Sequence, residues 1–480
     1  MAVVTPSHSQ RDPASFRDPA GFVFRRQGRV FRAIDAECRQ TLGDLFDRGL
    51  AARLIERRWL VRTDIVSEPA LLAELRGEHP RHRDFLEHAA IEPISYPYEW
   101  SSTMLADAAL LTLDLQTELL ADGFCLKDAS AYNVQFMHGR PAFIDWPSIV
   151  RDQRQSVWPA LGQFLPMFLY PLLMHHMRGW DLRSCFLGAP AGRSLEQVAA
   201  ALSWAALCRP SLWLDVTLPL LLGHWAESRP NASFAQTPQA KQENTNDSSA
   251  GQRLLLGRLR RKIERLAAKA KPRGAWHRYG DSNGYAETAD KAKQHFVAEA
   301  LTKLSPRRVL DLGCNTGEFS YLAAGCGAEV IAADADHDSV DALYRRLRQT
   351  PADITPLVVD LTNPSPGMGY RNCERPPFAS RGQADCVLAL ALVHHLHVRG
   401  NLSWQAIRDQ LAELTTDVLI VEHIPPDDPM FRRLIRFRDP PREEGSLAHF
   451  RAVFRQRLRF IREQRLPDSL RTMLLFRREE

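Results

Sequence analysis

The sequence has no pair of cysteines at metal-ligand spacing and no apolar run long enough to cross a membrane. Its eight cysteines are scattered, without a Cys-x-x-Cys unit or a Cys/His cluster. This pattern argues against a metal site or a disulfide framework and predicts reduced thiols in the cytoplasm. The most apolar stretch, residues 164–174, is short and is interrupted by Pro166 and Pro171. We therefore expect no transmembrane segment.

The sequence also shows neither the pattern of a secretory leader nor a general surplus of basic residues. Residues 1–11 contain no positively charged region followed by an apolar run, so no signal peptide is expected and the protein is predicted to be cytoplasmic. The formal net charge is +5, but residues 253–273 hold nine Lys or Arg against the single Glu264, which leaves the rest of the chain at −3. No specific nucleic-acid partner is expected for a chain with this charge distribution.

A length of 480 residues predicts two or three domains. Residues 232–251 are polar and nearly free of large apolar side chains, which predicts a disordered linker between an N-terminal domain, 1–231, and a C-terminal domain, 252–480. In the basic segment 253–273, leucines and an isoleucine fall on one helical face. The basic faces are candidates for contact with an anionic surface such as phospholipid or RNA. The simpler alternative is a solvated face on a helix that leads into and docks on the C-terminal domain.

The most informative segment is residues 308–323, where a short apolar strand ends in the turn Gly313-Cys-Asn-Thr-Gly317 and an amphipathic helix follows. Glycines allow a sharp turn and a close approach of ligand to backbone, and the helix N-terminus offers free N–H groups. A G-x-G-x-x-G dinucleotide fingerprint is absent, since the glycines are four apart and Asp311 precedes them. The pattern predicts a ligand site, but it does not favour a nicotinamide-dependent dehydrogenase.

Further strands are predicted at regular intervals, and several end in an acid. Residues 329–334 end in Asp334, which we expect to bind the two hydroxyls of a nucleotide ribose, with Asp336 as the alternative. Later strands are expected at 356–360, 384–392, 417–422, 458–461 and 473–476. Strands that alternate with helices predict an α/β fold with a parallel sheet and a ligand at the carboxyl ends of its strands. The last two strands suit an antiparallel closing hairpin.

The motif Asp311-Leu-Gly-x-x-x-Gly317 resembles motif I of the class I S-adenosylmethionine (SAM) methyltransferases. The segments 360–367, 389–396, 421–430 and 466–469 are also similar to bacterial methyltransferases related to a rhizobial nodulation host-specificity protein, and the resemblance extends over almost the whole chain. It implies a seven-stranded Rossmann-like sheet and SAM as cofactor. It further implies that either Tyr279 or Tyr285 covers the cofactor and that Asp360 lies near the adenine. The implied cofactor-binding set is Tyr279, Tyr285, Asp311, Gly313, Asn315, Gly317, Asp334, Asp360 and Leu361.

The N-terminal half is predicted to be an α+β domain, with a hairpin at 21–34 and a long helix at 101–121. In the segment that follows, Asp128, Asn133 and Asp145 match the spacing of the catalytic loop and metal-binding acid of kinase-like phosphotransferases. The segment departs from that pattern because Leu126 replaces the expected His and Trp146-Pro147 replaces Phe-Gly. No glycine-rich phosphate loop precedes it. The resemblance therefore implies a degenerate kinase-like domain, with capping of a turn as the alternative role of Asp128 and Asn133.

The predicted function is transfer of the SAM methyl group to an unidentified acceptor, for which the nodulation resemblance suggests a carbohydrate or small-molecule hydroxyl. A hydroxyl would have to lose a proton, and His394, His395 and Glu422 follow or end strands on the cofactor side, so they are the candidate bases. The histidine pair can equally cap and pack a helix. Two alternatives stay open, namely an ATP-binding or bifunctional kinase-like protein and a SAM-binding interaction module without turnover.

Overall fold

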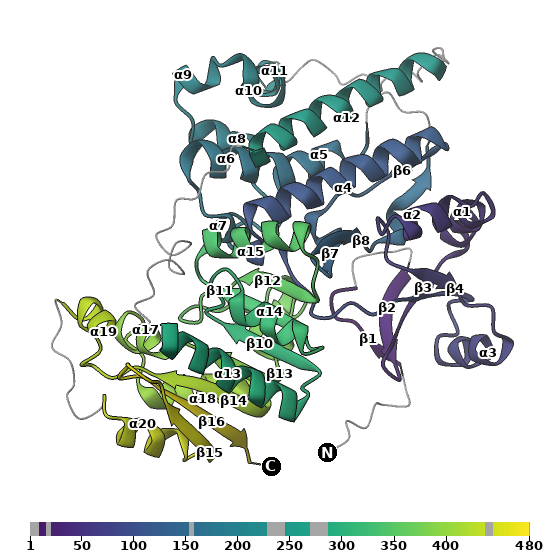
Figure 1. Ribbon diagram of the computed structural model, residues 1–480. Coiled ribbons are helices and arrows are strands. Elements are labelled where there is room, and N and C mark those ends of the chain that lie inside the picture. The colour runs from purple at the N-terminus through teal and green to yellow at the C-terminus, as the bar shows by residue number, and fades with distance from the viewer. Residues whose placement is uncertain are drawn as a thin grey trace.

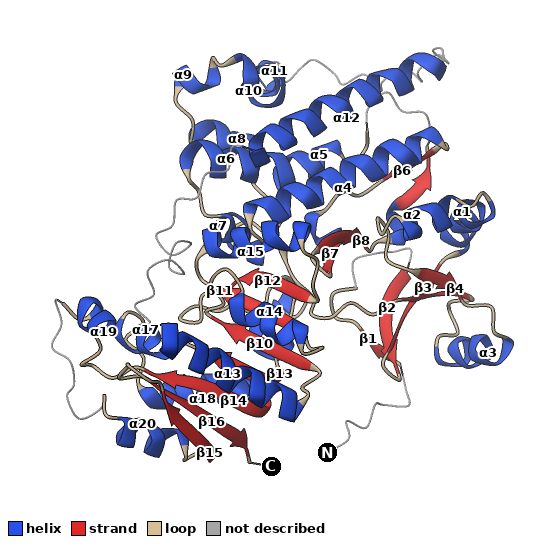
Figure 2. Cartoon of the chain, viewed as in Figure 1, coloured by secondary structure: helices blue, strands red, loops and turns tan. Residues whose placement is uncertain are grey.

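The computed structural model describes residues 9–15, 21–152, 158–227, 245–268, 287–436 and 445–479. Two halves lie against each other (Figure 1). The first half carries an antiparallel sheet and a group of helices, and the second is built around a larger sheet with helices on both faces (Figure 2). Within the described residues, no helix is long and apolar enough to cross a membrane.

The N-terminal half begins with a five-stranded sheet in the order β1-β2-β3-β5-β4. Gln27 and Gly28 both have positive φ, at 48° and 76°, and this two-residue turn joins β2 to β3 as the expected hairpin. Its strands and accompanying helices are β1 (Gln10–Arg11), β2 (Gly21–Arg26), β3 (Arg29–Ile34), α1 (Ala36–Asp47), α2 (Leu50–Glu56), β4 (Thr63–Ile65), α3 (Pro69–Glu78) and β5 (Asp84–His88).

The rest of this half is mainly helical and is centred on α4 (Ser102–Ala121), which Ser101 caps by accepting a hydrogen bond from the N–H of Met104. Two short antiparallel pairs follow it, β6 (Phe124–Leu126) with β9 (Ile149–Arg151) and β7 (Val134–Met137) with β8 (Arg140–Phe143). The α-helices and π-helices that follow are α5 (Leu161–Phe164), the π-helix η4 (Leu165–Leu169), α6 (Tyr170–Arg178), α7 (Leu182–Leu187), α8 (Leu195–Ala200), α9 (Trp204–Leu207), α10 (Pro210–Leu212), the π-helix η5 (Trp213–Thr217) and α11 (Leu218–Glu227).

The basic helix α12 (Thr245–Ala268) packs on α4 (Figure 1), and this corrects its expected docking on the C-terminal domain. Leu256, Leu259 and Ile263 are buried in the N-terminal core, and Arg260 pairs with Asp114 of α4 at 2.8 Å. An amphipathic helix packs against the surface that matches its apolar stripe and its charges, and for α12 that surface is α4. Residues 232–244 of the linker predicted at 232–251 lie outside the described residues. Residues 245–251 belong to α12, which begins at Thr245.

The C-terminal half contains the predicted seven-stranded sheet, in the order β12-β11-β10-β13-β14-β16-β15. Strands β10 to β14 pair in parallel, and β16 pairs antiparallel with both β14 and β15. This confirms the class I methyltransferase fold and its closing hairpin. The strands are β10 (Arg308–Leu312), β11 (Glu329–Asp334), β12 (Ile354–Val358), β13 (Ala384–Ala389), β14 (Thr415–His423), β15 (Leu458–Arg465) and β16 (Thr472–Arg478).

Helices cover both faces of this sheet, so its parallel strands are apolar on both sides. Side chains alternate along β10, and Leu310 and Leu312 face a layer that contains α18 and α20, whereas Val309 faces a layer that contains α13 and α15. The helices are α13 (Glu287–Leu304), α14 (Glu318–Gly325), α15 (His337–Gln349), α16 (Phe378–Arg381), α17 (Val393–Val398), α18 (Trp404–Leu414), α19 (Pro429–Leu434) and α20 (Leu447–Phe454).

The two halves meet where α15 lies across the N-terminus of α4. The backbone N–H of Thr103 donates to Asp341 at 3.0 Å, and that of Ser102 donates to His337 at 2.9 Å. These are N–H groups of the first helical turn, which have no partner within their own helix. Tyr344 donates to Asp107 at 2.8 Å and is itself fully buried in the N-terminal core. The two cores are therefore joined through α15.

Candidate functional site

The glycine turn at the end of β10 has the backbone geometry that the sequence predicted. Gly313, Asn315 and Gly317 have φ of 70°, 49° and 86°. This left-handed region is unfavourable for most residues other than glycine and asparagine. A Cβ atom at Gly317 would lie 2.4 Å from Cδ1 of Leu343, so the Leu343 side chain would have to move to admit any other residue. Gly317 also starts α14 without a side-chain cap, and the N-terminus of this helix faces the cavity described below.

Two acids lie immediately around this turn. Asp334, at the end of β11, accepts the backbone N–H groups of Asn315 at 2.9 Å and Asp336 at 2.8 Å. Burial raises the pKa of its carboxyl. Asp311 is also buried and accepts a hydrogen bond from Ser320 at 2.6 Å. Burial raises the pKa of Asp311 to about 6. Asp336, the alternative ribose ligand, caps α15 by accepting from the N–H of Asp338.

A cavity of about 610 Å³ opens at the carboxyl ends of the parallel strands. Its size is within the range of small-molecule sites, about 300–1,000 Å³. Asp360 and Leu361 follow β12 and form one wall, and Asp360 accepts hydrogen bonds from the N–H and hydroxyl of Thr362. The predicted cofactor residues within the described part of the chain, except Gly317, line this cavity: Asp311, Gly313, Asn315, Asp334, Asp360 and Leu361. Tyr279 and Tyr285 lie outside the described residues.

The structure separates the two neighbouring histidines of α17. His395 lines the cavity, and burial lowers its pKa to about 4, so its imidazole is neutral at pH 7. His394 is buried and does not line the cavity, and its ring lies 5.8 Å from that of Phe431. Its Nδ1 has no hydrogen-bond partner in the described part of the chain. Of the two, only His395 can meet a ligand in the cavity.

Glu422, the third candidate base, lies behind the cavity wall and is fully buried. Its Oε2 is 2.9 Å from Nζ of Lys293 on α13, and the same oxygen accepts the backbone N–H of Ala391 at 2.9 Å. On the far side, Arg471 lies 3.9 Å from Oε1 of Glu422 and pairs with Asp428 at 2.9 Å. The Glu422 carboxylate is thus part of a buried ion-pair network and has no direct contact with solvent.

Sequence reasoning missed several residues that line the cavity, among them Lys293, Phe319 and Arg399. Lys293 is 4% exposed, and its ammonium lies 5.0 Å from the centre of the Phe319 ring. A signal was present in the sequence, because Lys293 lies on the same helical face as the core residues Ala289 and Phe296. A lysine on an apolar face is almost never buried unless it is paired.

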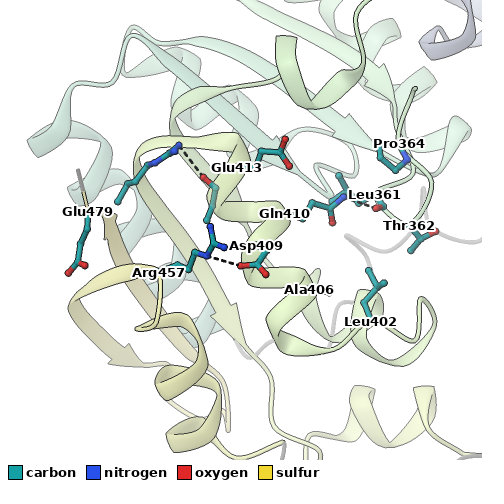
Figure 3. Close-up of a pocket in the computed structure, with 12 residues that line it drawn as sticks. Leu361, Thr362, Pro364, Leu402, Ala406, Asp409, Gln410, Glu413, Arg457 and Glu479 are labelled. Carbon is teal, nitrogen blue, oxygen red and sulfur yellow. Dashed lines mark hydrogen bonds and ion pairs between the residues drawn. The ribbon is translucent and has the colours of Figure 1, made fainter. Parts of the chain in front are cut away.

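A second hollow, of about 710 Å³, borders the loop that follows β12 (Figure 3). It shares Leu361 and Thr362 with the first cavity, and most of its other lining residues come from α18 and the end of β16. Gln410 donates to the carbonyl of Leu361 at 2.8 Å across it. None of the candidate bases lines this hollow, so the chemistry is expected in the first cavity.

The chain is 34% identical to the nodulation protein NoeA of Rhizobium meliloti (strain 1021) over 484 residues, which cover 98% of this chain and 96% of that protein. The chain belongs to the NoeA family. A methyltransferase domain model also matches residues 255–464, which include the glycine turn, the acids that follow it and His395. The protein is therefore a SAM-dependent methyltransferase of the NoeA family, and SAM is its cofactor.

Solved structures with similarity to the chain include the N-methyltransferase NodS from Bradyrhizobium japonicum WM9, at 12% identity and a TM-score of 0.30 over 40% of this chain and 98% of that one. The magnesium protoporphyrin IX methyltransferase ChlM from Synechocystis PCC 6803 is similar at 17% identity and a TM-score of 0.30, over 40% of this chain and 84% of that one. These scores are too low to add to the family assignment.

The structure also brings together the kinase-like residues of the N-terminal half, Asp128, Asn133 and Asp145. Burial raises the pKa of Asp128, and the charge of Asp145 raises it further. Asp145, the expected metal-binding acid, forms an ion pair of 2.7 Å with Arg32 of β3 and accepts a hydrogen bond from Ser148. Since Arg32 already neutralises Asp145, the structure does not favour the ATP-binding alternative for the NoeA-family chain.

Proposed function

We propose that the protein transfers the SAM methyl group to a hydroxyl of a carbohydrate or other small molecule, with His395 as the base. The observation that carries this proposal is that His395 is the one candidate base that lines the same cavity as the glycine turn. The His395 imidazole faces the cavity, whereas the Glu422 carboxylate is fully buried in its ion pair with Lys293.

The cavity suits a cofactor that is cationic at one end and carries a ribose and an adenine at the other. Asp334 lies next to the glycine turn, where its carboxylate can accept hydrogen bonds from the ribose hydroxyls. We assign Asp311 to the cationic methionine end of the cofactor, and Asp360 and Leu361 to its adenine. SAM supplies an activated methyl group on its sulfonium.

The protein then has to position the acceptor and remove one proton. A hydroxyl oxygen directed at the methyl carbon forms the new O–C bond as the S–C bond breaks, and its proton passes to the imidazole of His395. The other contributions of the chain are alignment and exclusion of water. An amine acceptor is the second candidate, and it would not depend on a base in this way.

The first test is a calorimetric titration of the full-length protein with SAM. We expect binding that Asp334→Asn weakens at least about tenfold, the equivalent of about 1.4 kcal/mol, while Asp336→Asn has a smaller effect. A larger loss of SAM binding in Asp336→Asn than in Asp334→Asn would assign the ribose to Asp336. Unchanged SAM binding in both variants would contradict the proposed cofactor site.

The second test follows methyl transfer from radiolabelled SAM to a panel of sugars and amines. His395→Ala should retain SAM binding but lose most transfer to a hydroxyl acceptor. A matched control is His397→Ala on the same helix, since His397 stacks on Trp404 and does not line the cavity. Labelling of amines alone, unaffected by His395→Ala, would contradict the hydroxyl acceptor and favour N-methylation.

A further inference from the structure

Exposed large apolar side chains gather at the helical end of the N-terminal half. Trp204 is 84% exposed, and Trp213 and Leu214 are 47% and 58% exposed. Elsewhere in the described part of the chain, large apolar side chains are exposed only at Tyr370, Ile461 and Leu470. We call the following residues the apolar end surface: Trp204 of α9, Trp213 and Leu214 of η5, Leu218, Leu221 and Leu222 of α11, and Leu254 of α12.

These elements are held together as one surface. Asp215 of η5 is buried and pairs with Arg258 of α12 at 2.6 Å, and it also pairs with Lys262. Leu254 precedes Arg258 by four residues, so both lie on the face of α12 that borders η5. Val216 is buried in the N-terminal core and anchors the same segment. The helices therefore bury one apolar side and expose a second one.

An apolar face that remains exposed beside a completed core indicates an interaction site. The helices α9, α10, α11 and α12 lie at the end of the molecule opposite the seven-stranded sheet (Figure 1). The apolar end surface is thus separate from the cofactor cavity at the ends of the strands.

Basic side chains flank this surface without acidic partners. Arg253, Arg261 and Arg265 of α12 and Arg209 at the start of α10 are exposed, and no ion pair involves any of them within the described residues. Asp215, the buried acid at the centre, is neutralised by its two basic partners. A partner that complements this surface has to be apolar and anionic.

We propose that the apolar end surface docks on an anionic phospholipid bilayer. Tryptophan and leucine side chains enter the boundary between headgroups and acyl chains, and the flanking arginines lie at the level of the lipid phosphates. A second copy of the chain fits less well, because two such surfaces would bring their unpaired arginines together without acids to neutralise them.

The test is flotation of the full-length protein with phosphatidylcholine vesicles that do or do not contain phosphatidylglycerol. Binding is expected with phosphatidylglycerol, weaker binding without it, and a decrease as salt is added. The double variant Trp213→Ser, Leu214→Ser should lower partitioning at least about tenfold, since it removes two inserting side chains. Arg261→Gln with Arg265→Gln should lower it for anionic vesicles only.

The matched control is Ile461→Ser with Leu470→Ser, which changes two apolar side chains of similar exposure, 43% and 42%, on the other half. This variant should partition like the unchanged protein, and all variants should keep its thermal unfolding midpoint. Lack of binding to anionic vesicles at low salt, or binding that the Trp213 and Leu214 changes leave intact, would overturn the proposal.

A dimer seen by sedimentation and abolished by the same two changes, in a protein that ignores vesicles, would overturn it in favour of a second copy. Binding to vesicles does not require SAM or methyl transfer. A failure of vesicle binding is therefore distinguishable from a failure of the proposed function.

Discussion

The carboxylate of Glu422 holds the backbone of Ala391, whose N–H it accepts at 2.9 Å. Ala391 has φ of 49°, a left-handed conformation that is strained for a residue with a side chain. It lies between β13 and α17, in the wall of the cavity that His395 lines and four residues before His395. The buried pair of Glu422 with Lys293 therefore supports the loop that positions His395.

Glu422→Gln should destabilise the protein by about 3 kcal/mol or more, because it leaves the buried ammonium of Lys293 without a counter-charge. The amide oxygen can still accept the N–H of Ala391. The free energy of unfolding would be measured by urea denaturation. The control is the double variant Lys293→Met, Glu422→Gln, which should lose less stability than Glu422→Gln alone. A loss below about 1 kcal/mol in the single variant would show that the pair contributes little.

Gly317→Ala should weaken SAM binding about tenfold or more, while Gly327→Ala should leave it unchanged. Both glycines have positive φ, at 86° and 90°, so both changes carry a backbone cost of about 1–2 kcal/mol. At Gly317 the new methyl also meets Leu343, whereas nothing lies within 4 Å at Gly327. Calorimetry with SAM and thermal unfolding of both variants would separate the two effects. Equal losses of SAM binding would refute the steric explanation.

SAM binding should tighten about tenfold between pH 5 and pH 7. The pKa of Asp311 is raised to about 6 by burial, so its carboxyl is mostly protonated at pH 5 and mostly ionised at pH 7, and a cationic ligand favours the ionised form. In the absence of ligand, the free energy of unfolding depends on pH in the opposite sense. The contribution of Asp311 to stability falls as the pH rises from its unfolded pKa near 4 to its folded pKa of about 6, and it is constant above that.

The check on this pH dependence is calorimetry at several pH values with the unchanged protein and with Asp311→Asn. The variant should show a shallower dependence, because burial also raises the pKa of Asp334 and leaves a residual slope. An identical slope in both proteins would assign the dependence to other groups.

Tyr344→Ala should destabilise both halves together by about 3–5 kcal/mol, because the ring fills the N-terminal core from a helix of the C-terminal half. Tyr344→Phe keeps the ring, which lies 5.7 Å from Phe136, and loses only the hydrogen bond to Asp107, so it should cost about 1 kcal/mol. Differential scanning calorimetry would follow both. Two separate transitions, of which only one moves, would show that the halves unfold independently.

The sequence by itself determined the C-terminal sheet and most of the residues proposed to bind the cofactor. Each strand is a short apolar run, Gly313 and Asp334 stand directly at strand ends, and Gly317 and Asp360 follow within a few residues. Such features are set by neighbours along the chain, because parallel strands deliver their carboxyl ends to one edge. The fold and the positions of these residues therefore follow from local pattern and connectivity.

Only the tertiary structure decided which side chains meet. Lys293 and Glu422 are far apart in sequence and pair because α13 covers the end of β14, and the rotation of α17 directs His395 and not His394 to the cavity. The stripe of α12 showed an apolar face but not its partner, which proved to be α4. Hydrophobic contact is non-directional, so a pattern can specify that a face is buried, while the packing of the whole chain determines against what.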